Sequence, residues 1–291
     1  MRSEVPIAQE TVFFKTGHFW ETQMTRGKDF TGDSYYGEIA ENYYKKRRSS
    51  VDFVAENEIL EGLLAGIPDQ SRVLDVPFGT GRFVEYYARK KMDVVGLEIS
   101  GDMIGAAKEI LGDKYNYCEI LQGDATETLP FDNDSVDVIV SFRFLKYFPY
   151  VTAKEILSEF RRVTRSTLII RMVVRRDHEH EQHLSDDYLS RLHKIKGNLY
   201  EKDVIKLFND VGFEVESSHS VNELAKTMKV ARVNLRPQEK RTLRTLRRLA
   251  GIRLGVIYKH LRNGSLLAAI SGVVRKKKEA RMVYQLRKAV D

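Results

Sequence analysis

The chain of 291 residues, 42% of them hydrophobic, is long enough for one large α/β domain with its own core and an additional segment. Its single cysteine, Cys118, excludes a disulfide framework and fits a reducing compartment. No stretch reaches the roughly 18–20 apolar residues of a transmembrane helix, and residues 1–25 lack a signal-peptide pattern, so the sequence predicts a cytoplasmic protein.

The net charge of +7 is unevenly distributed along the chain. Residues 236–291 contain 16 Lys and Arg residues but only 3 Asp and Glu, whereas residues 1–235 contain 32 and 38. This asymmetry predicts an acidic body that performs the chemistry and a basic tail that meets an anionic surface. We therefore expect an N-terminal arm at 1–34, a domain at 35–235 and a tail at 236–291.

Apolar residues in the domain alternate between the helical and the extended period. Helices are expected at 35–64 and 82–90, from the N-cap Ser100 to Leu111, from the capping box Thr152-Ala-Lys-Glu155 onward, and at 199–211. Strands are expected at 72–76, 93–97, 115–121, 135–141 and 167–174, followed by a hairpin-like pair at 213–219 and 227–235. The alternation predicts an α/β fold, a Rossmann-like, mostly parallel seven-stranded sheet with helices on both faces.

Ligands of such sheets bind beyond the carboxyl ends of the strands, so the residues that follow each predicted strand are the candidates for a site. Gly79 and Gly81 follow the first strand, and glycines let the backbone approach a ligand closely. Glu98 follows the second strand, where a carboxylate can accept hydrogen bonds from ribose hydroxyls. Asp124 and Ala125 follow the third strand, where an acid can accept from an adenine amino group. Singly, each residue is equally typical of a turn or a solvated acid, but in this order they fit one nucleoside ligand.

Three motifs, Val73-Leu-Asp75-Val-Pro-Phe-Gly79-Thr-Gly81, Val94-Val-Gly-Leu-Glu98 and Gln122-Gly-Asp124-Ala125, together resemble the class I S-adenosylmethionine-dependent methyltransferases. The resemblance covers roughly residues 36–235. It is closest to the small-molecule branch, including quinone-biosynthesis enzymes, which have an N-terminal helix similar to Tyr36-Gly-Glu-Ile-Ala-Glu-Asn-Tyr43. It implies S-adenosyl-L-methionine as the cofactor.

The resemblance also implies roles for individual residues. The residues that it assigns to the cofactor are Asp75, Gly79 and Gly81 at the methionine portion, Glu98 at the ribose, Met103, Asp124 and Ala125 at the adenine, and Ser141 or Phe142 beside the sulfonium. Phe78 departs from the family pattern, in which a small residue or cysteine is common, and this leaves the local shape of the loop open. A nicotinamide-binding fold is the competing interpretation, but it normally has a third glycine where this chain has Val84.

The acceptor side of the site is less well defined by the sequence. We expect Tyr43, Arg143 and Arg175 to contact the substrate. His178 and His180 follow the fifth strand and are the candidates for a general base, because a histidine pKa lies near neutrality. A solvated loop is the alternative for this segment. A metal site is not expected, since no further residues complete the His-x-His pair with clear spacing.

The basic tail has helical periodicity from Pro237 and breaks at Asn263-Gly264. An apolar run at 266–274 is followed directly by Arg275-Lys-Lys-Lys278. This pattern favours a basic helical extension that lies on an anionic membrane surface, on the inner face of a membrane. Binding to nucleic-acid phosphates and packing against a partner subunit through the C-terminal helices are the alternatives.

The sequence thus predicts a methyltransferase that acts on a small-molecule, lipid-linked or glycan acceptor, by O-methylation. Two alternatives remain open. One is an RNA or DNA methyltransferase whose basic tail binds phosphates, although the fourth strand ends in Ser141-Phe-Arg-Phe and lacks the prolines of exocyclic-amine enzymes. The other is an inactive methyltransferase fold that serves as a subunit of a complex.

Overall fold

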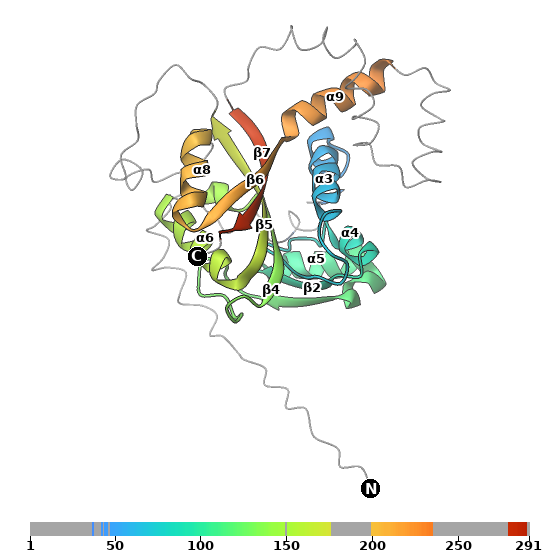
Figure 1. Cartoon of the computed structure of the whole chain (residues 1–291). Helices are drawn as coiled ribbons and strands as arrows, with labels where there is room; N and C mark the ends of the chain where they lie inside the picture. Colours follow the sequence, from blue (N-terminus) through green and yellow to red (C-terminus); the bar gives the residue numbers. More distant parts are fainter. Residues whose placement is uncertain are drawn as a thin grey trace. The chain divides into compact units, whose positions relative to one another are not determined.

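The computed structural model describes residues 37, 42, 44–45, 47–148, 150–175, 199–234 and 279–289 (Figure 1). Its helices are α3 (Val51–Leu64), α4 (Val84–Arg89), α5 (Gly101–Leu111), α6 (Tyr150–Val163), α8 (Glu201–Asp210) and α9 (Val221–Asn234), with short 3-10 helices η3 (Gly112–Tyr117) and η4 (Leu145–Tyr147). Its strands are β1 (Arg72–Asp75), β2 (Asp93–Glu98), β3 (Cys118–Gln122), β4 (Val136–Phe142), β5 (Thr164–Arg175), β6 (Phe213–Ser220) and β7 (Glu279–Lys288).

The strands form one seven-stranded sheet in the order β3-β2-β1-β4-β5-β7-β6. β1 to β5 pair in parallel, whereas β7 is antiparallel to both of its neighbours, β5 and β6. The predicted Rossmann-like, mostly parallel sheet is confirmed. The chain order reverses between β1 and β4, and in such sheets ligands bind at the carboxyl ends of the strands on either side of that switch.

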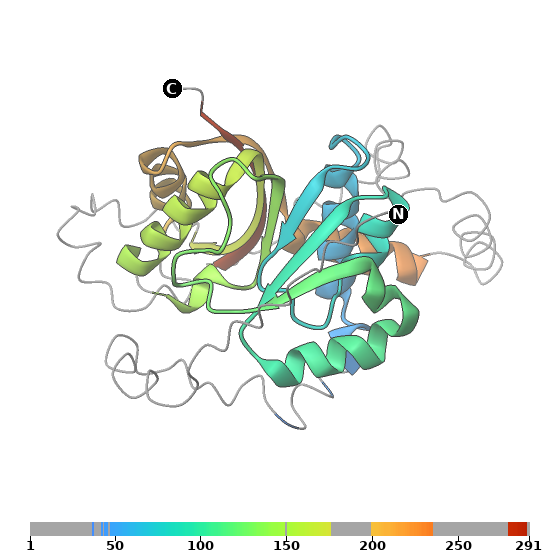
Figure 2. The same ribbon diagram turned by 90° about the horizontal axis from the view of Figure 1, so that it is seen from below.

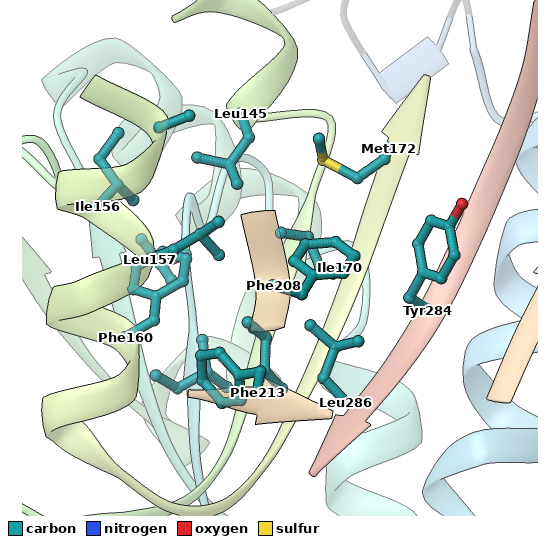
Figure 3. Packing of buried hydrophobic residues seen from close by; sticks show 14 of the residues in the cluster. Leu145, Ile156, Leu157, Phe160, Ile170, Met172, Phe208, Phe213, Tyr284 and Leu286 are labelled. Carbon is teal, nitrogen blue, oxygen red and sulfur yellow. The ribbon is translucent and has the colours of Figure 1, made fainter. Parts of the chain in front are cut away.

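Helices cover both faces of the sheet, as the views in Figures 1 and 2 show. On one face, α6 and α8 bury a cluster that includes Phe160, Phe208 and Tyr284. Figure 3 shows Phe160 of α6, Phe208 of α8 and Tyr284 of β7 in this cluster, together with Ile170 of β5. On the other face, residues of α3, α4 and α9 form a second cluster.

The seventh strand lies in the segment that the sequence assigned to a helical tail, so that prediction is wrong for residues 279–288. Every second side chain of β7 lies in the core on the α6 face, namely Ala280, Met282, Tyr284 and Leu286. This alternation is the period of a strand, and the high density of basic residues around it concealed it. The remaining tail residues, 235–278, lie outside the described residues, as does the arm at 1–34.

Three further element predictions need correction. Residues 227–234 belong to helix α9 and not to a strand, because Val221, Ala225 and Met228 follow the helical period and pack in the α3 cluster. The helix expected at 35–64 is interrupted, since Ser50 has an extended backbone and caps α3 by accepting from Phe53 N.

Helix α6 begins at Tyr150, two residues before the expected cap Thr152. The buried side chains of Tyr150 and Ala153 extend its apolar face by a turn, which favours the earlier start.

Candidate active site

The loop after β1 is held against both neighbouring strands. Val76 N donates to Val140 O of β4 at 2.9 Å, and Phe78 N donates to Leu97 O of β2 at 2.8 Å. Gly79 and Gly81 have φ of 59° and 68°, in the left-handed region that side chains disfavour. A Cβ on Gly81 would lie 2.5 Å from Leu111 Cδ1, so a side chain there would also displace the end of Leu111.

Phe78, whose size left the loop shape open, packs away in a small core of its own. Its ring is 3% exposed and clusters with Val84 and Ala107. It lies directly over Gly96 of β2, where a Cβ would come within 2.4 Å of Phe78 Cδ2. The large residue is therefore accommodated because β2 carries a glycine opposite it.

Glu98 ends β2 as a buried carboxylate bound by backbone amides. Its Oε2 accepts from Gly79 N at 2.8 Å, and its Oε1 accepts from Ser100 N at 3.0 Å. Burial raises the pKa of Glu98 above its usual range, although these amide donors act in the opposite direction. The predicted ribose-binding acid and the predicted glycine loop are thus in direct contact.

Met103 and Asp75 lie beside the same loop. Met103 is buried on α5, and its Cε lies 3.6 Å from the position of a Cβ on Gly79. Asp75 is 2% exposed, and its Oδ2 makes no hydrogen bond within the described residues. Burial raises the pKa of Asp75 well above its usual range, although the Tyr87 hydroxyl and Arg82 act in the opposite direction.

The end of β3 is joined to the end of β2. Gly123 N donates to Glu98 O at 3.0 Å, which places Asp124 next to the ribose-binding acid along the sheet edge. Asp124 Oδ1 accepts from both the amide and the hydroxyl of Thr126, each at 2.8 Å. Ala125 is buried. The three predicted strand ends therefore follow one another along one edge.

The carboxyl end of β4 lies next to that of β1, on the other side of the reversal in strand order. Ser141 is buried, and its Oγ makes no hydrogen bond within the described part of the chain. Phe142 packs edge-on against Phe83, with ring centroids 5.0 Å apart. Arg143 follows with φ of 64°, a left-handed backbone that a non-glycine residue rarely adopts.

Sequence reasoning missed a cluster of charged residues beneath α3. Glu56 of α3 is completely buried and contacts three arginines, with Arg82 Nη1 at 2.8 Å, Arg143 Nη2 at 2.7 Å and Arg171 Nε at 3.2 Å. Burial raises the pKa of Glu56, but the three arginines outweigh it, so the pKa lies below its usual range. The signal was Arg171, a charged residue inside the otherwise apolar strand sequence Thr167-Leu-Ile-Ile-Arg171-Met-Val-Val.

The remaining acceptor-side predictions have different outcomes. Arg175 ends β5, where its amide donates to Leu199 O at 2.9 Å and its guanidinium lies 5.3 Å from the Tyr200 ring centroid. Tyr43, His178 and His180 lie outside the described residues. Within the described ranges, no group of three or more His, Cys, Asp or Glu side chains is arranged to hold a metal ion.

Residues 73–167 match the family described as a methyltransferase domain, and this segment holds the glycine loop, Glu98, Asp124 and Ser141. This segment is a methyltransferase domain, and S-adenosylmethionine is the cofactor expected for it. No curated protein sequence matches this methyltransferase.

Solved structures share the fold of the methyltransferase at low sequence identity. Geranyl diphosphate methyltransferase in complex with SAM superimposes with a TM-score of 0.52 and 12% identity, over 81% of this chain and 85% of that chain. A putative sarcosine dimethylglycine methyltransferase from Galdieria sulphuraria gives 0.50 and 16%, over 81% and 85%. StiE O-MT gives 0.50 and 16%, over 81% and 75%.

The buried polar groups of the methyltransferase fit its cofactor. Asp75 Oδ2 and Ser141 Oγ are buried without a hydrogen bond in the described residues, and a ligand with amino and hydroxyl groups can supply the missing partners. The predicted roles of Glu98 at the ribose and of Asp124 at the adenine are compatible with this arrangement, in which the Gly79 loop and Met103 lie beside Glu98. The bound cofactor supplies an electrophilic methyl group, so the protein has to bind, orient and exclude water.

Proposed function

We propose that this methyltransferase transfers the methyl group to a hydroxyl of a small-molecule, lipid-linked or glycan acceptor. The observation that carries the proposal is the arrangement around the strand switch. Glu98 and the Gly79 loop lie on one side of the switch, and Ser141 near the end of β4 and Arg143 directly after it lie on the other. A cofactor bound by Glu98 and the Gly79 loop would have Ser141 and Arg143 beside it, across the strand switch. We therefore expect the methyl acceptor to bind at the carboxyl end of β4. The likeness of the fold to StiE O-MT supports a hydroxyl as acceptor.

The test combines cofactor binding with product analysis. Calorimetry of the full chain should give saturable binding of S-adenosylmethionine, which Glu98→Ala weakens at least about tenfold, or about 1.4 kcal/mol. Labelled methyl groups should then enter a hydroxyl of a lipid, glycan or small-molecule fraction. Label in RNA or DNA would replace the proposal with the nucleic-acid alternative. Binding without transfer to any fraction would favour the inactive subunit.

A hydroxyl acceptor must lose its proton during transfer, and we propose His178 or His180 as the base. Replacing the responsible histidine by alanine should lower kcat by about 10²-fold or more and leave cofactor affinity unchanged. The two variants are compared with His219→Ala, a histidine of β6. Full activity of both His178→Ala and His180→Ala would exclude a catalytic role.

We further propose that residues 235–278 bind an anionic membrane surface, on the inner face of a membrane. They contain 13 Lys and Arg residues and one acidic residue. Each basic residue near such a surface contributes about 1 kcal/mol. None of the described helices is long and apolar enough to cross a membrane. Packing against a partner subunit through this segment is the competing proposal.

Flotation of the full chain with anionic and with neutral liposomes tests the membrane proposal. The wild type should float only with the anionic vesicles. Replacing Arg275, Lys276, Lys277 and Lys278 together by glutamine should reduce binding, and so should added salt. Equal flotation of the quadruple variant and the wild type would contradict the proposal, and co-sedimentation with RNA instead would favour phosphate binding.

A further inference from the structure

The arginine cluster beneath α3, formed by Arg82, Arg143 and Arg171 around Glu56, lies at the strand switch. Arg82 follows the glycine loop that leaves β1, and Arg143 follows β4 directly. Arg171 of β5 is in register with Phe142, the last residue of β4. The cluster therefore borders both the loop assigned to the cofactor and the strand end from which the acceptor approaches.

Within the described residues, the cluster pairs three guanidinium groups with one carboxylate. Glu56 Oε2 is shared between Arg82 and Arg143, and Glu56 Oε1 lies 3.2 Å from Arg171 Nε. Arg82 is also held by Asn57 Oδ1 and by Phe53 O, which are neutral acceptors. The cluster therefore gathers three guanidinium groups around one buried carboxylate, next to the end of β4.

Arg171 is a buried cation with a donor that has no partner among the described residues. The residue is 5% exposed, and its Nη1 is a buried donor without a hydrogen bond in the described structure. Burial, together with the charges of Arg143 and Arg281, lowers the pKa of Arg171 to about 10, against the opposing effect of Glu56. A buried guanidinium that lacks a partner for one of its nitrogens is a ready site for an additional oxyanion.

Arg143 is the arginine of the proposed oxyanion site that a ligand can reach from solvent. Its side chain is 15% exposed, more than that of Arg171 at 6%. Its left-handed backbone at the end of β4 turns the chain at the point where an acceptor has to arrive. Planar guanidinium groups match carboxylate and phosphate oxygens in fork geometry, which lysines do not.

We propose that Arg143 and Arg171 bind an oxyanion, a carboxylate or a phosphate, that belongs to the methyl acceptor. The inference rests on the proposed function, because it assigns a charge to the acceptor of that reaction. An oxyanion site here would restrict the methyl acceptors to molecules that carry a carboxylate or a phosphate near the hydroxyl to be methylated. Glu56 then acts as the positioning residue that holds the two guanidinium groups, and Arg82 couples them to the glycine loop.

Calorimetric titration of the full chain with inorganic phosphate and, separately, with malonate tests the inference without the acceptor. At least one anion should bind saturably, and whichever binds more tightly indicates a phosphate or a carboxylate. Arg171→Gln and Arg143→Gln should each weaken binding at least about tenfold. Arg165→Gln should leave it unchanged, because Arg165 lies on the same strand but is exposed and pairs with Asp137.

Several outcomes would overturn the inference. They are the absence of saturable anion binding to the wild type, equal binding by Arg143→Gln, and displacement of the bound anion by S-adenosylmethionine, which would assign the cluster to the cofactor carboxylate. If Arg171→Gln does not fold, Arg143→Gln decides alone. S-adenosylmethionine binding is measured in parallel. If the cofactor does not bind but the arginine variants still lose the anion, the proposed function fails and the anion site stands.

Discussion

At the scale of single residues, Glu98 determines how the cofactor site is held before any ligand arrives. Both of its oxygens accept backbone hydrogen bonds, one of them from the glycine loop. The carboxylate therefore orders the loop that surrounds the ligand. We expect the ribose hydroxyls of the cofactor to compete for the same oxygens, in which case cofactor affinity depends on the charge of Glu98.

Cofactor affinity is expected to fall in acid. The pKa of Glu98 lies above its ordinary value of 4.5, and hydroxyl donors bind the ionised form, so binding lowers this pKa. Affinity is then constant above the raised pKa of the free protein. It falls by up to about tenfold per pH unit as the pH drops through that pKa. Calorimetry with S-adenosylmethionine between about pH 8 and about pH 5 measures it.

Glu98→Gln is the control for this pH dependence. The variant should bind the cofactor weakly, with a flatter pH profile. Any remaining slope belongs to other groups, of which Asp75 is the first candidate because its pKa is also raised. An unchanged profile in the variant would show that Glu98 does not titrate with cofactor binding.

At the scale of elements, the segments with strong local signals were predicted best. β1, β2, β4 and β5 are apolar runs flanked by glycine or polar residues, and their ends carry the residues that the site uses. β7 was missed because its partners, β5 and β6, are distant in sequence, and because its alternating pattern directly follows the basic run Arg275-Lys-Lys-Lys278. The contact of Glu56 with its three arginines was missed for the same reason, since no local pattern marks a pairing of α3 with β4 and β5.

The fit between β2 and the glycine loop can be tested by a compensating pair. Gly96→Ala should destabilise the protein by about 1–3 kcal/mol, because the new Cβ would lie 2.4 Å from Phe78 Cδ2 and 2.6 Å from Phe78 Cγ. Phe78→Cys destabilises the protein by itself, because it removes a buried ring, but in the same chain the two changes should cost less than the sum of their separate costs, because the smaller side chain vacates that space. Urea unfolding of the two single variants and the double variant gives the coupling energy.

Gly105→Ala is the matched control for this pair, because a Cβ there meets nothing within 4 Å. In helix α5 it should be neutral or stabilising, by up to about 1 kcal/mol. Additive effects of Gly96→Ala and Phe78→Cys would mean that the two residues do not share the space between β2 and the loop.

At the scale of the whole molecule, the basic segment 235–278 connects two elements of the same sheet domain and is not a separate tail. Residues 235–278 join α9 to β7, and β7 lies between β5 and β6. Lys288 Nζ donates to Thr164 O, and Arg161 donates to the carbonyls of Gly212 and Ala289, so the C-terminal end of β7 is fixed to the sheet and to the neighbouring elements. The body at 35–235 is therefore not a complete domain, and a truncation that removes the supposed tail also removes part of the core.

Two deletions distinguish the role of β7 in folding from the proposed role of residues 235–278 in membrane binding. A chain that ends at Leu235 loses Met282, Tyr284 and Leu286, and burial of each such side chain contributes about 1.5–3 kcal/mol. Together with the lost strand pairing, the lost burial approaches the total free energy of unfolding of about 5–15 kcal/mol, so the truncated chain should not fold.

A chain in which a Gly-Ser linker replaces residues 237–275 keeps β7 and should fold, because loop length has a weak effect on stability. Circular dichroism and urea unfolding distinguish the two, and a cooperatively folded chain ending at Leu235 would contradict this role of β7. The linker variant, which lacks nine of the 13 basic residues of 235–278 and keeps the methyltransferase sheet, then complements the quadruple variant in membrane flotation.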